Sequence, residues 1–272
     1  MKKKIIIGLV VILLMSFLHM QNNTLETTFY KVETKQDIGA KSLRIVQISD
    51  LHGKEFGKDN EKLIKKIEEL KPDIIFLTGD LVDSRRYEPQ KSYEFCEKVS
   101  KICKIYYVSG NHEERKKAYD YEKIRKMGIF VLDNKLEKYN EQIEIIGIRD
   151  PQGVRGKVDN TIKRELKEAF SESIKDNFKI LLAHRPHKID LYLDYSPDLV
   201  FSGHAHGGQI RLPLIGGLLT PGQGFFPKYS EGIMQDKNTK LLISRGLGNS
   251  IFPQRLFNLP EILVLDINCI EK

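Results

Sequence analysis

The hydrophobic pattern alternates between short, wholly apolar runs and longer segments in which apolar residues recur every three or four positions. Short runs such as IIFL and ILLA are typical of strands that are covered on both faces. The longer segments predict amphipathic helices, for example Asn60–Leu70 with Leu63 and Ile67 on one face. No linker rich in proline, glycine or serine interrupts the alternation. The pattern therefore predicts one layered α/β domain.

The predicted elements follow one another without an internal repeat. The expected strands are Leu43–Ile48, Asp73–Leu77, Lys104–Val108, Ile129–Leu132, Ile143–Ile148, Lys179–Ala183, Leu199–Ser202, Leu241–Ser244 and Ile262–Ile267. The expected helices are Asn60–Leu70, Gln90–Cys103, Lys116–Met127 and Ile162–Ile174. Between Gly207 and Gly232 the chain is rich in glycine, proline and aromatic residues.

The N-terminus has a pattern of its own, because MKKK precedes a run of 16 mostly apolar residues, Ile5–Met20. Basic residues before such a run are typical of a secretory signal. The run is short for a membrane span, which needs about 20 residues, but no small-residue cleavage motif follows it. We therefore favour a signal anchor in residues 1–22 over a cleaved signal peptide, with a buried helix as the third alternative. The lysines favour a cytoplasmic N-terminus and an extracytoplasmic domain at the cell membrane, which would be secreted if the signal were cleaved.

Charge and cysteine content narrow the class further. The net charge is +7, and residues 1–44 hold seven Lys/Arg against three Asp/Glu, which leaves only +3 for the other 228 residues. This distribution suits a basic juxtamembrane segment, 23–42, beside anionic lipid. A nucleic-acid-binding protein would concentrate positive charge on its folded domain, here 43–272. Three cysteines exclude a disulfide framework, and Cys96 and Cys103 on one predicted helix would lie about 10 Å apart along its axis, beyond disulfide reach.

Five polar clusters each follow a predicted strand: SDLH, TGDLVD, SGNHE, LAHRPH and SGHAHGGQ. Sites in open α/β sheets form beyond the carboxyl ends of strands, so we expect these clusters to meet at one edge. Histidine and aspartate bind metals and transfer protons near neutral pH. Each cluster alone has an ordinary explanation as a turn, a helix cap or a buried histidine. Five in this order predict a single site.

Spacing indicates how metals would be bound. Asp50 and His52 are two residues apart and would point to the same side of an extended segment. His204 and His206 repeat that spacing and, about 6–7 Å apart, would straddle a pair of metals separated by about 3.5–4 Å. The Asp80 carboxylate is able to bridge two cations through its two oxygens. With an amide oxygen and one more imidazole, the candidate ligands are Asp50, His52, Asp80, Asn111, His184, His204 and His206.

From about Leu43 to Ile267 the chain resembles the calcineurin-like metallophosphoesterases. The resemblance rests on five motifs in this order: DLH, GDLVD, GNHE, a strand-end histidine and GHAH. GHAHGGQIRLP and SRGLGNS…PQRLFNLPEI resemble a membrane-associated or exported branch typified by YaeI and YkuE, related to enzymes that cleave UDP-diacylglucosamine pyrophosphate. The resemblance implies a four-layered α/β fold, a β-sandwich flanked by helices. It also implies a binuclear centre of two divalent metal ions; ligands without thiolate suit Mn, Fe, Zn or Mg.

The resemblance further implies a role for each residue. The implied reaction is hydrolysis of a phosphodiester or pyrophosphate by a hydroxide that bridges the metals. His112 would face the substrate as general acid or as a stabiliser of the phosphoryl oxygens, and would not be a ligand. The first metal would be held by Asp50, His52 and His206, the second by Asn111, His184 and His204, with Asp80 shared.

Neighbouring residues leave alternatives open. Asp83 and Glu113 either orient histidines or lie on the surface. We expect His187 to cap the following segment and to be incidental to the site. The dipeptide Arg149–Asp150 is a further candidate for substrate contact.

Directly after the metal histidines, Ile210–Pro227 carries the large apolar residues Leu212, Leu214, Ile215, Leu218, Leu219, Phe225 and Phe226. Either they form an apolar lip suited to an acyl chain, or they pack into the domain. With the N-terminal anchor, a lip favours a membrane- or envelope-associated substrate such as a nucleotide-sugar lipid. Alternatives are a soluble nucleotide or phosphoprotein phosphatase, a metal-stabilised envelope binding protein without turnover, and a purely structural tethered protein. A nuclease is disfavoured, since the chain has no tryptophan for base stacking.

Overall fold

A computed structural model describes residues 2–116, 118–154, 156–249 and 252–270. Some predictions fall partly outside these ranges. They concern Lys117 of the predicted helix Lys116–Met127, Ser250 of the SRGLGNS motif, residue 1 of the predicted signal anchor and residues 271–272 of the predicted domain 43–272. The helices are α1 (Lys2–Asn23), α2 (Glu61–Leu70), α3 (Pro89–Val99), α4 (Asn111–Lys116), α5 (Tyr121–Lys126), α6 (Val158–Ala169) and α7 (Ile189–Tyr192), with short 3-10 turns at Lys58–Asn60, Pro186–Lys188, Leu193–Tyr195 and His206–Gly208. The strands are β1 (Glu26–Thr34), β2 (Ser42–Ile48), β3 (Ile74–Leu77), β4 (Lys104–Tyr107), β5 (Phe130–Val131), β6 (Lys135–Lys138), β7 (Ile143–Gly147), β8 (Phe178–Leu182), β9 (Leu199–Ser202), β10 (Arg211–Leu212), β11 (Gly216–Gly217), β12 (Leu219–Thr220), β13 (Gly224–Phe225), β14 (Gly232–Asp236), β15 (Thr239–Ile243) and β16 (Glu261–Cys269).

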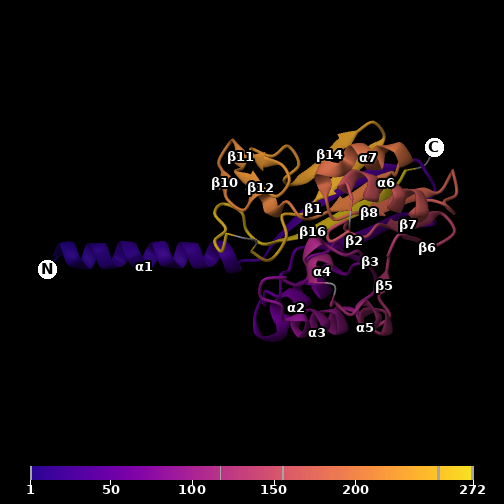
Figure 1. Cartoon of the computed structure of the whole chain (residues 1–272). Coiled ribbons are helices and arrows are strands. Elements are labelled where there is room, and N and C mark those ends of the chain that lie inside the picture. The colour runs from indigo at the N-terminus through magenta and orange to yellow at the C-terminus, as the bar shows by residue number, and fades with distance from the viewer. Residues whose placement is uncertain (1, 117, 155, 250–251, 271–272) are drawn as a thin grey trace.

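Two mixed six-stranded sheets form the centre of the domain (Figure 1). The first has the order β1-β16-β2-β3-β4-β5, and β2 to β5 run parallel. The second has the order β14-β15-β9-β8-β7-β6, with β15, β9, β8 and β7 parallel and an antiparallel strand at each edge. Parallel strands of both sheets therefore direct their carboxyl ends to loops that can share one site.

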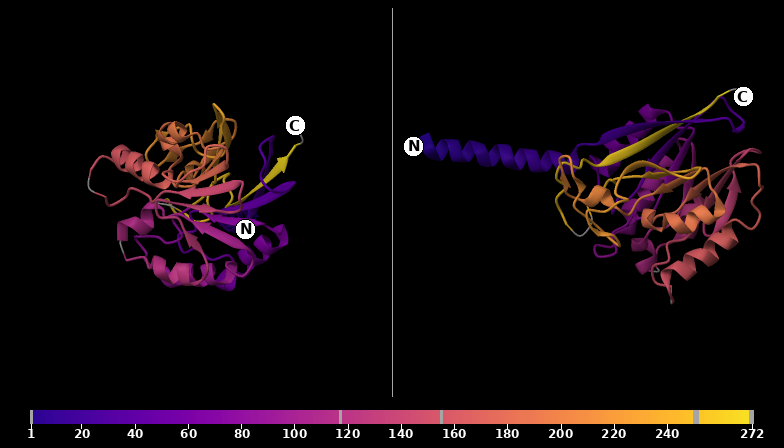
Figure 2. Two further views of the ribbon diagram at one scale, coloured as in Figure 1. Left: turned by 90° about the vertical axis from the view of Figure 1, so that its right-hand side faces the viewer. Right: turned by 90° about the horizontal axis from the view of Figure 1, so that it is seen from above.

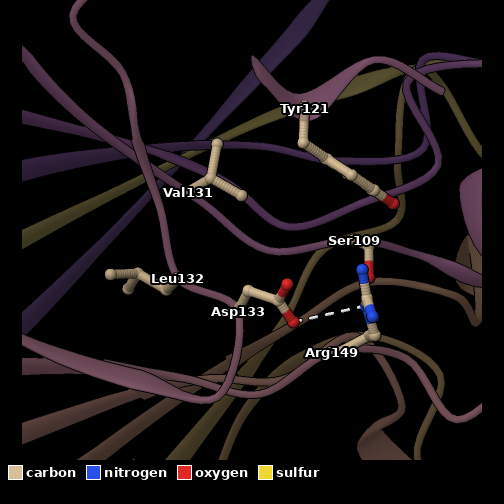
Figure 3. A pocket seen from close by; sticks show the side chains of 6 residues that line it. All are labelled: Ser109, Tyr121, Val131, Leu132, Asp133 and Arg149. Atoms are coloured by element: carbon tan, nitrogen blue, oxygen red, sulfur yellow. Dashed lines mark ion pairs between the residues drawn. The ribbon is translucent and has the colours of Figure 1, made fainter. Parts of the chain in front are cut away.

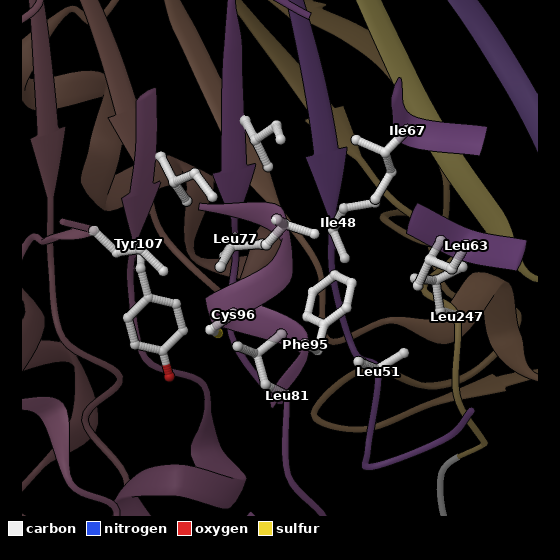
Figure 4. Packing of buried hydrophobic residues seen from close by; sticks show 14 of the residues in the cluster. Ile48, Leu51, Leu63, Ile67, Leu77, Leu81, Phe95, Cys96, Tyr107 and Leu247 are labelled. Carbon is white, nitrogen blue, oxygen red and sulfur yellow. The ribbon is translucent and has the colours of Figure 1, made fainter. Parts of the chain in front are cut away.

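Three apolar clusters hold these layers together. The central cluster lies between the sheets, where the Phe76 ring is 4.9 Å from that of Phe201 across the interface. On the outer face of the first sheet, Leu63 of α2 and Phe95 of α3 pack against strand residues such as Leu77 (Figure 4). A third cluster joins α6 and α7 to the second sheet. The four-layered α/β sandwich flanked by helices is thus confirmed.

Helix α1 projects from the domain as a separate rod (Figure 2). An 18-residue window of this 22-residue helix has a mean hydropathy of 2.0, and most of the apolar side chains of the helix are exposed. At 1.5 Å per residue it is about 33 Å long, enough to cross the apolar core of a bilayer. By length and composition it is a candidate membrane span.

Strand β1 corrects the expected boundary of the domain. Residues 23–42 were expected to form only a juxtamembrane segment, but Glu26–Thr34 pairs along its whole length with Glu261–Cys269. The folded domain therefore begins before residue 43. The strand was not predicted because most of its side chains are only half-buried or exposed, so its sequence contains no continuous apolar run.

Several helix boundaries also differ from the predictions. Helix α3 ends at Val99, so Cys103 lies in the following turn and not on the helix. The predicted helix Lys116–Met127 is replaced by α4 and the shorter α5, and the predicted Ile162–Ile174 begins and ends earlier. Cys96, Cys103 and Cys269 are free cysteines.

Candidate metal centre and active-site cleft

The five polar clusters follow β2, β3, β4, β8 and β9, so the structure places them at the carboxyl ends of parallel strands from both sheets. Their loops have unusual backbone. Asp50, His52, Asp80, His204 and His206 all have φ between 49° and 66°, in the left-handed region that residues other than glycine rarely adopt. The expected extended conformation of Asp50–His52 and His204–His206 is therefore wrong. Such strain persists only where the surroundings impose it, and it clusters at functional sites.

One group of potential ligands consists of Asp50, His52 and His206, all buried. His206 Nε2 lies 3.3 Å from Asp50 Oδ1 and 3.2 Å from His52 Nε2. Asp50 is held in place by the Ser49 hydroxyl, which donates to its Oδ2 at 2.6 Å, and by the backbone N–H of His204. Burial raises the pKa of Asp50 to about 6.

A second group consists of Asp80, His184 and His204, also buried. His184 Nε2 lies 3.3 Å from Asp80 Oδ2 and 3.3 Å from His204 Nδ1. The amide of Asn111 faces the cleft, and its buried Oδ1 has no hydrogen-bond partner among the described residues. Burial lowers the pKa of His184, but the Asp80 carboxylate more than offsets this and raises it to about 10. This carboxylate therefore stabilises positive charge at the position, whether a proton or a cation.

Asp80 connects the two groups through one oxygen. Its Oδ2 faces His184 and also lies 3.8 Å from His52 Nε2 in the first group. Its Oδ1 instead accepts the backbone N–H of His112 at 2.7 Å. Oδ1 thus already has a backbone donor at the N-terminus of α4, and bridging of two cations through both oxygens stays a prediction.

Glu113 positions the Asp80 loop and does not orient a histidine. Its carboxylate accepts the backbone N–H groups of Asp80 at 2.9 Å, Leu81 at 2.6 Å, Val82 at 3.4 Å and Gly110 at 3.0 Å. Burial raises the pKa of Glu113, to about 8, although hydrogen bonds from the backbone oppose that rise. The side chain ties the β3 and β4 loops together from beneath.

The separations in both groups fit metal coordination. Donors about 2.0–2.2 Å from one ion, at angles of 90–110°, are themselves about 3–3.5 Å apart. The 3.2–3.3 Å separations within each group match this value. Buried carboxylates also need compensating positive charge. The chain thus has buried His/Asp sites consistent with two divalent cations.

His112 differs from His184 in the direction of its ring nitrogens. His184 Nδ1 lies 2.7 Å from the Thr78 carbonyl, so Nδ1 carries a proton, and Nε2, which faces Asp80, is the nitrogen that would bind a cation in place of a second proton. The Nδ1 of His112 instead accepts the backbone N–H of Ser84 at 2.9 Å, which places the ring proton on Nε2. Asp83 Oδ1 is 3.3 Å from the same Nδ1. Burial lowers the pKa of His112, so the neutral ring is favoured.

The side chain of His112 also lies close enough to His52 and Asp80 for the three to be a further potential ligand group. The Ser84 hydrogen bond argues against that set, since an Nε2 that bears a proton has no lone pair for a metal.

Residues 43–208 match the family model described as calcineurin-like phosphoesterase. The chain belongs to this family. It is 30% identical over 266 residues to the Bacillus subtilis metallophosphoesterase YkuE, covering 92% of this chain and 87% of YkuE. It is 26% identical over 242 residues to the Escherichia coli phosphodiesterase YaeI, covering 84% of this chain and 83% of YaeI. A crystal structure of a Thermus thermophilus protein is similar in fold, with a TM-score of 0.55 at 15% identity over 75% of this chain and 90% of that one.

The cleft of this metallophosphoesterase has a volume of about 360 Å³ and opens beside both ligand groups. Its lining includes three arginines, Arg85, Arg115 and Arg185, that were not among the site residues predicted from the sequence. Arg185 belongs to the LAHRPH cluster, in which only the histidines were considered as site residues. Asp150, a suggested substrate contact, instead holds Arg185 through two hydrogen bonds of 2.7 and 2.8 Å.

The suggested substrate contact of Arg149 is not borne out by its position. Arg149 lies in a separate cavity of about 10 Å³ with Ser109 and Tyr121, and it pairs with Asp133 at 3.3 Å (Figure 3). Such a cavity has space for about one water molecule. Arg149 therefore pairs with the acidic side chains of Glu114 and Asp133 and is not one of the described residues that line the cleft.

His187 is neither a cap nor remote from the site. Among the described residues, no side chain caps the short helical segments around it, and its ring centroid is 5.8 Å from that of His204. A Cβ at Gly222 would lie 2.9 Å from its ring, so the 210–227 segment passes directly over it. His187 packs between a potential ligand and the cleft wall.

Residues 210–227 form the exposed apolar lip that was one of the two alternatives. The fully exposed Leu214 lies on this segment, and Pro221 and Gly222 of the same segment line the cleft. Further exposed apolar side chains of the lip are Ile215, Leu219, Phe225 and Phe226.

Two residues of the PQRLFNLPEI motif, Arg255 and Asn258, support the backbone around His206 and Asp50. Asn258 Nδ2 donates to the carbonyls of His206 at 2.8 Å and Gln209 at 3.1 Å. Arg255 is fully buried and donates to the Gly248 carbonyl, while the Gly248 N–H donates to the Asp50 carbonyl at 2.6 Å. Their side chains therefore hold the backbone around the first group.

Proposed function

We propose that this metallophosphoesterase binds two divalent cations in the two groups described, with Asp80 shared between them. One cation would be held by Asp50, His52 and His206, the other by Asn111, His184 and His204. The observation that carries this assignment is the position of Asp80 Oδ2 between His52 of one group and His184 of the other. Asn111 Oδ1, which has no hydrogen-bond partner among the described residues, supports this assignment. The N and O ligands suit Mn, Fe, Zn or Mg.

The residues around the cations would complete a hydrolytic site. When bound, such a pair of cations supplies a water of lowered pKa and neutralises charge on phosphoryl oxygens. His112 presents an Nε2–H to the cleft. The neutral ring would hydrogen-bond to a phosphoryl oxygen, and the protonated ring would donate its Nε2 proton to the leaving oxygen and so return to the neutral form. Asp83 beside Nδ1 would stabilise the ring when it becomes charged. The proposed reaction is hydrolysis of a phosphodiester or pyrophosphate.

The proposed substrate is membrane- or envelope-associated, such as a lipid-linked nucleotide sugar. The lip supports this: a second cavity of about 390 Å³ lies on it, lined by Leu212, Leu214, Ile215 and Phe257 among others. Its exposed apolar side chains would be stabilised by lipid rather than by water.

The attachment of α1 supports the same substrate class. The Phe17 ring of α1 is 5.9 Å from that of Phe257, and Gln254 donates to the Leu18 carbonyl at 3.0 Å. The backbone of Leu256 in turn pairs with residues at the start of the lip. Helix and lip lie on the same side of the domain in Figures 1 and 2. A membrane that contained α1 would therefore lie beside the lip, and the N-terminal lysines favour an extracytoplasmic domain.

Elemental analysis combined with a phosphoester panel tests this function. The full-length protein is expected to contain about two metal ions per chain and to hydrolyse bis-p-nitrophenyl phosphate with added Mn²⁺, losing activity with chelator. Lipid and nucleotide-sugar substrates in the panel identify the preferred class. Metal without hydrolysis of any ester would favour an envelope binding protein, and a preference for soluble nucleotides or phosphopeptides would refute the membrane substrate.

A further inference from the structure

Three arginine side chains, Arg85, Arg115 and Arg185, line the cleft next to the metal groups. Among the described residues, Asp80 is the only carboxylate in the same lining, and it faces the histidines of both groups. Two bound cations would already neutralise the charge of one phosphate. The additional arginines therefore indicate a second anionic group on the substrate.

Arg185 is fixed by its neighbours. Its guanidinium donates to both oxygens of Asp150 and, at 3.4 Å, to Gln152 Oε1, and its side chain is only 14% exposed. Two parallel hydrogen bonds of this kind restrict the guanidinium to one plane. Arg185 thus forms a rigid cationic wall whose charge is partly offset by Asp150.

Arg85 and Arg115 are less compensated. Arg85 Nε lies 3.4 Å from Asp83 Oδ1, but Asp83 also pairs with Arg86 at 3.3 Å, so two guanidinium groups share one carboxylate. Arg115 donates to Ser84 Oγ at 3.4 Å and forms no ion pair with any residue in the described ranges. The backbone N–H of this Ser84 holds the His112 ring. Arg115 is therefore placed on the side of the cleft where His112 would meet the leaving group.

We propose that Arg85 and Arg115, backed by Arg185, bind a second phosphate on the leaving-group side of the scissile phosphorus. Guanidinium groups suit this role because their planar donors match phosphate oxygens. The inference rests on the proposed function and narrows it to pyrophosphates, in preference to diesters with an uncharged head group. The cleft volume is at the lower end of ligand sites. Phosphates and a head group would occupy it, and acyl chains would leave past Gly222 to the lip.

The double variant Arg85→Gln/Arg115→Gln in the full-length protein tests the subsite, with Arg86→Gln as matched control. Arg86 shares the Asp83 partner but is 74% exposed and does not line the cleft. Three substrates are compared: bis-p-nitrophenyl phosphate, a soluble nucleoside diphosphate sugar, and a lipid pyrophosphate in vesicles. The double variant is expected to raise KM for both pyrophosphates and to lower their kcat/KM relative to the monophosphate diester by roughly 10–100-fold, whereas Arg86→Gln leaves this ratio unchanged.

An equal loss on all three substrates, or no loss on any, would overturn the subsite. A loss confined to one pyrophosphate would identify soluble or lipid substrate as its source. Calorimetric binding of a methylene-bridged bisphosphonate gives a readout independent of turnover, and it should weaken at least tenfold in the double variant. If the wild-type protein held no metal and cleaved nothing, the proposed function would fail, while bisphosphonate binding would still decide the role of the arginines.

Discussion

The floor of the cleft and its lip differ in almost every physical property. The floor consists of strand ends from two sheets, and its histidines, carboxylates and amide are at most 7% exposed. The lip is a glycine-rich excursion with four two-residue strands and large apolar side chains in solvent. A packed floor holds reactive groups within a few tenths of an ångström, whereas an exposed wall is free to adapt to substrate. Reaction type therefore depends on the floor, and substrate choice on the lip and the arginines beside it.

The largest expected effect comes from Asp80→Asn, which removes the charge shared by both ligand groups. Metal content should fall below two ions per chain, and kcat/KM for bis-p-nitrophenyl phosphate should fall by roughly 10⁴-fold or more, since each 1.4 kcal/mol lost is tenfold in rate. Elemental analysis and steady-state kinetics measure the two. The exposed Asp236 provides the matched control, Asp236→Asn. Full metal content and activity in Asp80→Asn would contradict a shared ligand.

His112→Gln separates proton donation from metal binding. We expect metal content to stay at the wild-type level and kcat to fall by roughly 10²–10⁴-fold, the usual contribution of a general acid. Wild-type activity would remove His112 from the mechanism. Loss of one metal would instead indicate that it acts as a ligand with His52 and Asp80.

Glu113→Gln probes the support beneath the floor. A carboxylate that accepts several backbone N–H groups cannot be replaced by an amide without placing an N–H donor against another donor. The free energy of unfolding should fall by about 2–4 kcal/mol, measured by urea denaturation of the chelator-treated protein. The exposed Glu94, changed to Gln, should shift it little. Unaltered stability would mean that the loops are held together by other contacts.

Glu165 is a second buried carboxylate, and unlike Glu113 it accepts no backbone N–H groups from the described residues. Its Oε2 has no hydrogen-bond partner among the described residues, and burial raises its pKa to about 8. The pKa of Glu165 in the folded state is above its unfolded value near 4.5, so the folded state binds more protons between these two values. The contribution of protonated Glu165 to stability is therefore complete below about pH 4.5 and is lost as the pH rises to 8. Glu165→Gln should therefore be more stable than the wild type at pH 8 by about 1–3 kcal/mol, with little gain at pH 5. Equal gains at both pH values would contradict the titration.

The smallest effect on chemistry is expected from Phe225→Ser on the lip. Hydrolysis of a soluble diester should change less than about twofold, whereas hydrolysis of a lipid substrate in vesicles should fall by about 3–10-fold, because about 1–2 kcal/mol of apolar burial is lost. Ile174 is an exposed apolar residue in the loop after α6, and Ile174→Ser is the control. An equal effect of both substitutions would remove the lip from substrate binding.

The parts of the fold that followed from sequence are those with dense, local signals. The apolar runs of β3 and β8 and the amphipathic α2 agree closely with their predicted ranges. Strand β1 was missed because its partner lies more than two hundred residues away and its edge position leaves its side chains half-buried. Helix α3 ended early because tertiary packing, and not periodicity, decides where the last turn stops.

The candidate ligands show the same division. Histidines and aspartates after strands are visible in the sequence, and the structure brings them together at one edge. The orientation of Asp80 was not visible, because its Oδ1 is engaged by the backbone N–H of His112, 32 positions along the chain. Arg85 and Arg115 were missed because surface arginines are common in sequence, and only the cavity distinguishes them from Arg86.

The sequence by itself determined the family, the layered α/β fold and the residue types at the strand ends, because these depend on local periodicity and on motifs of a few residues. Only the tertiary structure decided which oxygen of Asp80 faces the histidines of both groups, which nitrogen of His112 carries the proton, and that the apolar 210–227 segment stays in solvent beside α1. These properties depend on which donors, charges and surfaces lie opposite each other across the sheets. Such pairings arise from long-range packing, which no short stretch of sequence encodes.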